Sequence, residues 1–189
     1  MIPASPVMDF LLTRRSRPAK MLTAPAPDRD ALMRLLTVAA RVPDHGKLEP
    51  WRFIVLTPAA IARLTETIAA RATERDLPPE ARAKAVSPFA SSPVVVAVVA
   101  SPKPSAKIPE IEQTLSVGGV CLSLVNAALA SGWGACWLTG WPAMDRPVLD
   151  SLGLAPHEWI AGFIHIGTCS ITPPERPRPD IAQLTEWRA

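Results

Sequence analysis

The chain has 189 residues, of which 48% are hydrophobic and 20% charged, enough apolar material for one domain with a sizeable core. Its net charge of +3 comes from 20 basic residues interleaved with 17 acidic ones, which disfavours the stripe of Lys and Arg typical of nucleic-acid-binding proteins. The charge pattern therefore leads us to expect no nucleic acid as partner. No uncharged apolar stretch reaches the ~20 residues of a membrane span without Gly, Pro or turn signals, so we expect no membrane as partner either.

The first third of the chain predicts two helices and a turn. Apolar residues favour a short helix over Met8–Arg15. Asp28 or Asp30 can cap a second helix, whose apolar positions recur at helical spacing until Pro43 ends it. The run Pro43–Gly46 then contains the residues of a tight turn.

The middle of the chain alternates strand and helix. Arg52–Thr57 predicts a strand, and Ala59–Arg75 predicts a helix with one apolar face. The segment Leu77–Pro88 is charged and interrupted by prolines, and we assign neither helix nor strand to it. Pro93–Ala100 is β-branched and continuous, which is typical of a strand covered on both faces.

The longest predicted helix covers Glu110–Ser131 and ends at Gly132, a residue suited to a helix C-terminus. It is apolar nearly all round, which is typical of a helix in the middle of a protein or in an interface. Strands follow at Ala135–Thr139 and Trp159–Gly167, and the prolines of Pro173–Pro179 exclude regular structure. This order of elements predicts an α+β fold, a central sheet with helices on both sides.

The cysteines and histidines indicate no metal site. The three cysteines are odd in number and lack zinc-ligand spacing, and the three histidines are scattered. We predict buried thiols for Cys121 and Cys136, because both lie in apolar stretches. Such thiols suit a reducing cytoplasm, and Met1–Phe10 lacks the basic start and apolar run of a signal peptide. The expected location is therefore cytoplasmic.

Two arginine-rich segments lie near opposite ends of the chain. Arg14, Arg15 and Ser16 offer two guanidinium groups and a hydroxyl in a row, which suits a phosphate group. A solvated helix end has the same composition. Alternating prolines hold Arg176 and Arg178 on a stiff segment, which is either a second phosphate clamp or a charged tail.

Two further segments have the composition of binding loops. Arg41 and His45 flank the rigid turn, where they can bind a ligand or make only local hydrogen bonds. The glycine-rich run Gly132–Gly140 can grip a heteroaromatic ring or simply join a helix to a strand. Its central residues are Trp137, Leu138 and Thr139. The Rossmann, Walker A, zinc-protease and nucleophile-elbow signatures are absent from the sequence.

These four features, in this order, resemble the nitroreductase family of flavoproteins. In that family an Arg-x-Ser near the N-terminus precedes a Pro-Trp-x-Phe, here Arg14–Ser16 and Pro50–Phe53. The Arg-x-Pro-Asp-His pattern within Ala40–His45 resembles the short, minimal members of the family. The runs Gly132–Trp137 and Phe163–Thr168 also match, so the resemblance covers nearly the whole chain.

The resemblance implies one nitroreductase-like FMN-binding domain over residues 1–189. Its fold would be a three-layer α/β/α sandwich around a mixed, mainly antiparallel sheet, in a homodimer with FMN at the subunit interface. Arg41 and His45 match positions that reach the flavin of the partner subunit. The implied cofactor-binding residues are Arg14, Arg15, Ser16, Arg41, His45, Trp137, Leu138, Thr139 and Arg178. The chain departs from the family at Pro18, where many members place a Lys or Arg near the flavin N1; Arg15, Arg17 or Lys20 can substitute.

The implied activity is an FMN-dependent NAD(P)H oxidoreductase. NADH or NADPH would pass a hydride to the flavin and leave, and a nitroaromatic, quinone or similar small molecule would then accept electrons in a ping-pong scheme. Because the flavin carries the chemistry, we name no catalytic side chain. Two alternatives stay open. One is a flavin-binding protein of the same fold that serves flavin storage or degradation, dehalogenation or dehydrogenation; the other is a basic binding module without a cofactor.

Overall fold

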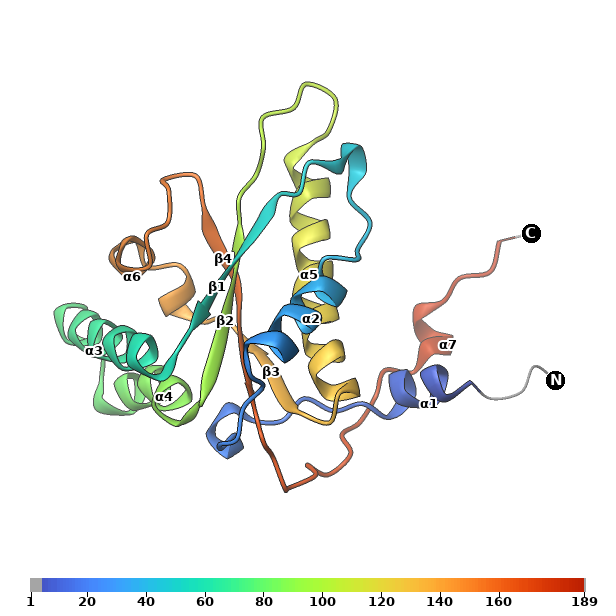
Figure 1. Ribbon diagram of the computed structural model, residues 1–189. Coiled ribbons are helices and arrows are strands. Elements are labelled where there is room, and N and C mark those ends of the chain that lie inside the picture. The colour runs from blue at the N-terminus through green and yellow to red at the C-terminus, as the bar shows by residue number, and fades with distance from the viewer. Residues whose placement is uncertain (1–4, 189) are drawn as a thin grey trace.

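The computed structural model describes residues 5–188, which build a central sheet with helices on both of its faces (Figure 1). The strands are β1 (Trp51–Leu56), β2 (Val94–Ala100), β3 (Gly134–Leu138) and β4 (Trp159–Gly167). They pair in the order β1-β2-β4-β3, and each pairing is antiparallel. The predicted α+β class, the layered arrangement and the mainly antiparallel pairing are confirmed.

One face of the sheet is covered by α3 (Pro58–Glu74), α4 (Pro79–Ser91) and α6 (Arg146–Ser151). The opposite face is covered by α2 (Arg29–Ala39) and α5 (Glu110–Ala130). Successive side chains of a strand point to opposite faces, so helices on both sides bury a central strand completely. Every residue of β2 is buried, as its continuous apolar sequence predicts.

No helix was predicted for the charged, proline-interrupted segment Leu77–Pro88, yet most of it belongs to α4. Pro78 and Pro79 lie at the beginning of the helix, where the first N–H groups have no intrahelical partner and a missing donor costs little. Pro88 lies in the last turns, and the helix continues past it to Ser91. Phe89 is buried there against Phe163, with ring centroids 5.0 Å apart, and this packing stabilises the end of the helix. The short α6 was not predicted either.

The outward face of α5 is apolar. Its inner face packs on the sheet, while Ile111, Leu115 and Leu122 are each about half exposed or more on the outside. By length and composition alone this helix would also suit a membrane span, although 39% of its apolar window is buried within the described part of the chain. A core helix of a folded domain meets the same criterion. The inner face of α5 lies in the core, as expected for a central helix, and its outer apolar face is exposed in the single chain.

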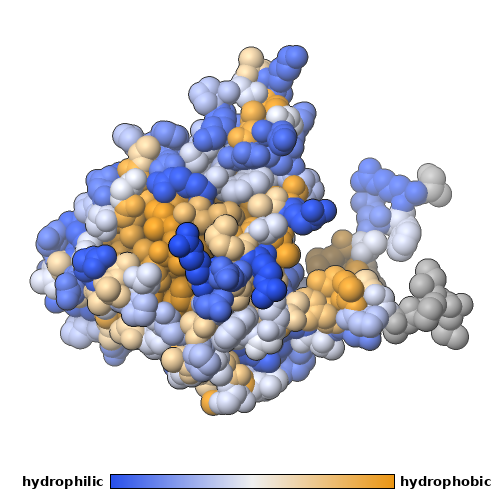
Figure 2. Space-filling model, viewed as in Figure 1, coloured by the Kyte–Doolittle hydropathy of each residue, from blue (hydrophilic) through white to orange (hydrophobic). Residues whose placement is uncertain are grey.

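Both ends of the described chain project from the body on one side (Figure 1). Helix α1 (Pro6–Thr13) is capped by the Ser5 hydroxyl and buries none of its residues. Figure 2 shows hydrophobic surface on the projecting segment that contains α1, where Val7, Leu11 and Leu12 are exposed. Helix α7 (Ile181–Leu184) projects on the same side of the body and is exposed as well. Exposed apolar surface of this kind is typical of a protein–protein contact.

Three short 3₁₀ turns complete the chain: η1 (Ala19–Met21), η2 (His45–Lys47) and η3 (Trp141–Ala143). The capping prediction for α2 is confirmed at Asp28, whose carboxylate accepts from the backbone N of Ala31 at 2.8 Å. The tail over Pro173–Pro179 has no regular structure, as predicted.

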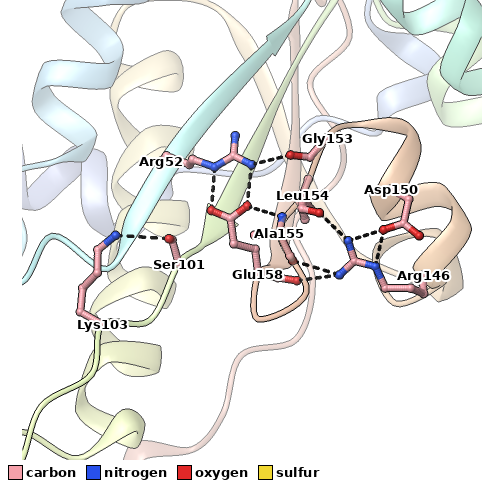
Figure 3. Close-up of polar contacts among 9 residues, drawn as sticks. All are labelled: Arg52, Ser101, Lys103, Arg146, Asp150, Gly153, Leu154, Ala155 and Glu158. Atoms are coloured by element: carbon pink, nitrogen blue, oxygen red, sulfur yellow. Dashed lines mark hydrogen bonds and ion pairs between the residues drawn. The ribbon is translucent and has the colours of Figure 1, made fainter.

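A buried carboxylate ties β1 to the loop before β4 (Figure 3). Glu158 is 7% exposed and accepts hydrogen bonds from Arg52 Nε at 2.8 Å and Arg52 Nη2 at 2.6 Å. It also accepts from the backbone N of Ala155 at 2.9 Å. The Arg52 bonds are the main cause that lowers the pKa of Glu158 from 4.5 to about 2. The same pair raises the pKa of Arg52, so this arginine has a structural role.

Candidate active site

A cavity of about 450 Å³ lies where the two ends of the chain meet. Its walls come from the segment after α1, from α4, from β3 and from the C-terminal tail. We call it the basic cavity, after the residues that give it its charge. These are Arg14, Arg15, Lys20, Lys84, Arg176 and Arg178.

Contacts between distant parts of the chain build the basic cavity. Arg15 donates to the backbone carbonyl of Pro174, which is 159 positions away in the sequence. The Arg15 guanidinium also lies 3.6 Å from the Glu175 carboxylate, and Arg178 Nε lies 2.9 Å from it. Arg14 Nη2 donates to the Ser16 hydroxyl at 3.0 Å. The two arginine-rich segments therefore form one site.

The positive charge of this cavity is incompletely balanced. Arg14 forms no ion pair among the described residues, and its buried Nε has no hydrogen-bond partner there. Burial lowers the pKa of Arg14, and the neighbouring Arg178 and Arg15 lower it further. A desolvated guanidinium beside like charges is unfavourable until an anion arrives, and a phosphate group supplies the acceptors that it lacks. The residues present therefore fit a phosphate-bearing ligand.

An apolar cavity of about 600 Å³ adjoins the basic cavity and shares Lys84, Pro88 and Leu138 with it. We call it the aromatic cavity. Its lining includes Phe89, Trp137 and Trp141, together with Thr139.

The indole of Trp137 is held in place within the aromatic cavity. Its Nε1 donates to the Ala161 carbonyl at 2.9 Å. A Cβ at Gly162 would lie 2.2 Å from the same Nε1, so only glycine lets the indole approach β4 this closely. The two cavities together suit a ligand with an anionic end and a flat apolar part.

The structure brings most of the predicted site residues together. Arg14, Arg15, Ser16, Leu138 and Arg178 line the basic cavity, and Trp137, Leu138 and Thr139 line the aromatic cavity. The basic segments Arg14–Ser16 and Arg176–Arg178 were each compatible with a solvated end, and their shared cavity favours the binding interpretation.

Arg41 and His45 are not part of these cavities within one chain. Arg41 lines a separate surface cavity of about 580 Å³, which α1 and α5 also border. His45 pairs with Glu112 on α5, with Nδ1 2.6 Å from Oε2. One subunit therefore keeps the turn residues apart from the arginine-rich site.

Several lining residues were not identified from the sequence, among them two polar side chains of the basic cavity. Lys84 and Ser87 enter the basic cavity from α4, in the segment to which no helix was assigned. The signal was present in the spacing of Ala81, Ala85 and Phe89, which repeat every four residues. The prolines obscured it.

The predicted burial of the cysteines is confirmed for Cys121 and Cys136. Cys136 contributes to the wall of the basic cavity, and burial raises the pKa of its thiol to about 11. At neutral pH this thiol is protonated and is no nucleophile. Over residues 5–188, no cluster of three or more His, Cys, Asp or Glu side chains is arranged to hold a metal ion.

Residues 11–168 match the model of the nitroreductase family. A Haemophilus influenzae protein assigned as an NAD(P)H nitroreductase is 36% identical over 162 residues, which are 85% of this chain and 87% of that protein. A nitroreductase-like family protein from Bacillus cereus has a similar solved structure, with a TM-score of 0.82 at 22% identity, covering 100% of this chain and 98% of that one. A Desulfovibrio desulfuricans protein assigned as a nitroreductase and solved in complex with FMN has a TM-score of 0.77 at 20% identity, covering 98% and 99%.

The resemblance inferred from four short motifs is thus confirmed over most of the chain, and the expected sandwich is the fold of the solved relatives. The match to the family model ends at residue 168, so it does not include Arg176 and Arg178. The contribution of these two residues to the basic cavity is known from the structure alone. By sequence and by fold, this chain belongs to the nitroreductase family, a family of oxidoreductases.

Proposed function

We propose that this chain is an FMN-dependent NAD(P)H oxidoreductase that reduces nitroaromatic, quinone or similar small acceptors by a ping-pong hydride transfer. The observation that carries the proposal is the unbalanced charge of the basic cavity in a chain of this family. Arg14 is desolvated beside Arg15 and Arg178 without an anion of its own. The phosphate of FMN provides that anion.

The residues of the two cavities divide the binding of FMN between them. Arg14, Ser16 and Arg178 hold the phosphate, with Arg15 beside them, and Trp137, Leu138 and Thr139 border the ring system. When bound, FMN would supply the hydride and electron-transfer chemistry between the nicotinamide and the acceptor. The side chains bind and orient, and none has to serve as an acid or base. Residues 1–189 act as a single FMN-binding domain.

The functional unit is a homodimer with FMN at the subunit interface. The exposed apolar residues of α1 and α5 support this, since surface of this kind is unfavourable in water. Arg41 and His45, which match family positions that reach the flavin of the partner subunit, lie outside the basic cavity of their own chain, as such a dimer requires. A second subunit would bring its own Arg41 and His45 to the flavin, and light scattering should give twice the mass of the chain.

The proposed location is the cytoplasm, with small molecules and no nucleic acid or membrane as partners. The three free cysteines, of which Cys121 and Cys136 are buried, are compatible with a reducing compartment.

Spectroscopy of the purified protein tests the proposed activity. The protein, as isolated or after addition of FMN, should be yellow and should bleach anaerobically with NADH or NADPH. A nitroaromatic or quinone should restore the colour, and initial rates should give parallel double-reciprocal lines. Failure to bind FMN would refute the proposal. Flavin that binds without bleaching would instead favour flavin storage or another flavin-dependent role.

A further inference from the structure

We propose that Glu112 is a positioning residue, which fixes the His45 imidazole so that its Nε2 atom faces the flavin of the partner's site. The inference rests on the proposed function, in which FMN lies at a subunit interface. It assigns a role to a carboxylate on α5 that belongs to neither cavity.

The geometry of the pair determines which ring nitrogen is available. His45 Nδ1 lies 2.6 Å from Glu112 Oε2. A carboxylate only accepts hydrogen bonds, so the hydrogen must lie on Nδ1. The His45 side chain is 62% exposed, and Nε2 is the nitrogen left for another partner. An imidazole without such a neighbour can carry its hydrogen on either nitrogen.

The backbone around His45 is held without help from Glu112. The Asp44 carboxylate accepts from the backbone N of Leu48 at 3.2 Å and from that of Glu49 at 2.9 Å. The Ser116 hydroxyl of α5 donates to the carbonyl of Pro43 at 2.5 Å. These bonds close the turn on both sides of His45. The contribution of Glu112 is therefore to the orientation of the ring.

The turn also stores backbone strain. Gly46, Lys47 and Glu49 have φ values of +68°, +54° and +48°, the left-handed region that costs free energy for the two residues other than glycine. A Cβ at Gly46 would lie 2.4 Å from Ile108 Cδ1, so the turn is packed tightly against the loop before α5. A strained turn that its surroundings hold rigidly is typical of a segment that presents a side chain to a ligand.

The pair itself adds little to folding stability, because both side chains are well exposed, at 62% and 43%, and exposed ion pairs contribute little. Loss of the pair should therefore change the tautomer of the His45 ring and the affinity for FMN, and leave the free energy of unfolding nearly unchanged. The variants Glu112→Ala and Glu112→Gln separate these effects. Glu110→Ala is the matched control, since Glu110 lies in the same first turn of α5 and forms no ion pair among the described residues.

The first measurement is the ring ¹⁵N spectrum of the protein without FMN, at about pH 8.5, where ordinary imidazoles are neutral. His45→Gln identifies the His45 signals among those of the three histidines. We expect the Nδ1–H form in the wild type and in Glu112→Gln, whose amide oxygen still accepts. Glu112→Ala should shift the ring toward the Nε2–H form, while Glu110→Ala should leave it unchanged.

The second measurement is FMN affinity by flavin fluorescence. Glu112→Ala should weaken binding roughly five- to tenfold, the effect of one hydrogen bond lost through disorder of the ring. Glu112→Gln and Glu110→Ala should bind within about twofold of wild type.

Two outcomes overturn the role of Glu112 while the proposed function stands. One is a wild-type protein that binds FMN but carries the Nε2–H form of His45. The other is a Glu112→Ala variant that keeps both the wild-type tautomer and the wild-type affinity. A wild-type protein that binds no FMN overturns the proposed function instead, and with it the flavin as the ligand of Nε2.

Discussion

Arg14 and Arg52 are both partly buried arginines, and their surroundings differ in one respect. Arg52 meets the buried carboxylate of Glu158, and this pairing raises its pKa (Figure 3). Arg14 meets Arg15 and Arg178 instead, and its pKa is lowered. Arg52 joins two parts of the fold, and the chain supplies its anion. Arg14 lines the basic cavity, and a ligand has to supply its anion.

The comparison separates stability from binding. A paired arginine at a fold junction should matter for unfolding and little for the ligand, while an arginine without an anion should matter for the ligand and little for unfolding. Variants at the two positions therefore test whether the difference in environment is a difference in role.

Arg52→Ala should have the largest effect. It leaves Glu158, which is 7% exposed, without the partner that stabilises its charge. We expect the free energy of unfolding at neutral pH to fall by about 3 kcal/mol, measured by urea denaturation. The double variant Arg52→Ala/Glu158→Gln should recover part of the loss, because no unpaired charge remains. An Arg52→Ala variant of full stability would show that the pair is not structural.

Arg14→Ala should leave unfolding nearly unchanged and weaken FMN binding. One charge-assisted hydrogen bond to the phosphate is lost, which costs roughly 1.5–3 kcal/mol, or about ten- to a hundredfold in Kd. Arg14→Lys is the control, because it keeps the positive charge and loses the planar guanidinium. Its FMN affinity should lie between those of the wild type and Arg14→Ala. Equal FMN affinity in the wild type and in Arg14→Ala would remove this residue from the phosphate site.

Acid should remove the contribution of the Arg52–Glu158 pair. The folded pKa of Glu158, about 2, lies below its ordinary value of 4.5, so its stabilising effect is complete above about pH 4.5. It is lost as the pH falls toward about 2. The wild type should therefore exceed Glu158→Gln by about 1–2 kcal/mol at neutral pH, and the two should converge in this acidic range. Parallel curves for the two proteins would contradict the assignment.

Glu175→Gln should have the smallest effect, in the opposite direction. Glu175 is the carboxylate beside Arg15 and Arg178, and it competes with a ligand phosphate for them. Its removal should tighten FMN binding about twofold at low salt, with little change at high salt. Fluorescence titration at two ionic strengths measures this, and weaker binding would show that Glu175 supports the cavity instead of competing for it.

The strands and the long helix could be predicted from sequence because their patterns are local. The continuous apolar run of β2 and the apolar length of α5 each indicated the correct element. Helix α4 was missed, because Pro88 within the segment argues against a helix and outweighed the four-residue spacing of Ala81, Ala85 and Phe89. The packing of Phe89 on Phe163, which stabilises the end of this helix, depends on the tertiary fold and could not be predicted from the local sequence.

The site was predictable in its parts and not in its assembly. The arginines near both ends were identified from composition and resemblance, but their meeting depends on contacts such as that of Arg15 with Pro174. Lys84 was missed because its helix was missed. The pairing of His45 with Glu112 joins positions 67 residues apart, and neither residue alone indicates it.

The contact between Arg15 and Pro174 also separates the integrity of the sheet from that of the basic cavity. The four strands of the described chain end by Gly167, so the sheet includes no residue of the tail. The basic cavity needs the tail, because Arg176 and Arg178 line it and Pro174 contacts Arg15. A single proteolytic cut between Ser170 and Arg176 should therefore leave the sheet folded and release FMN.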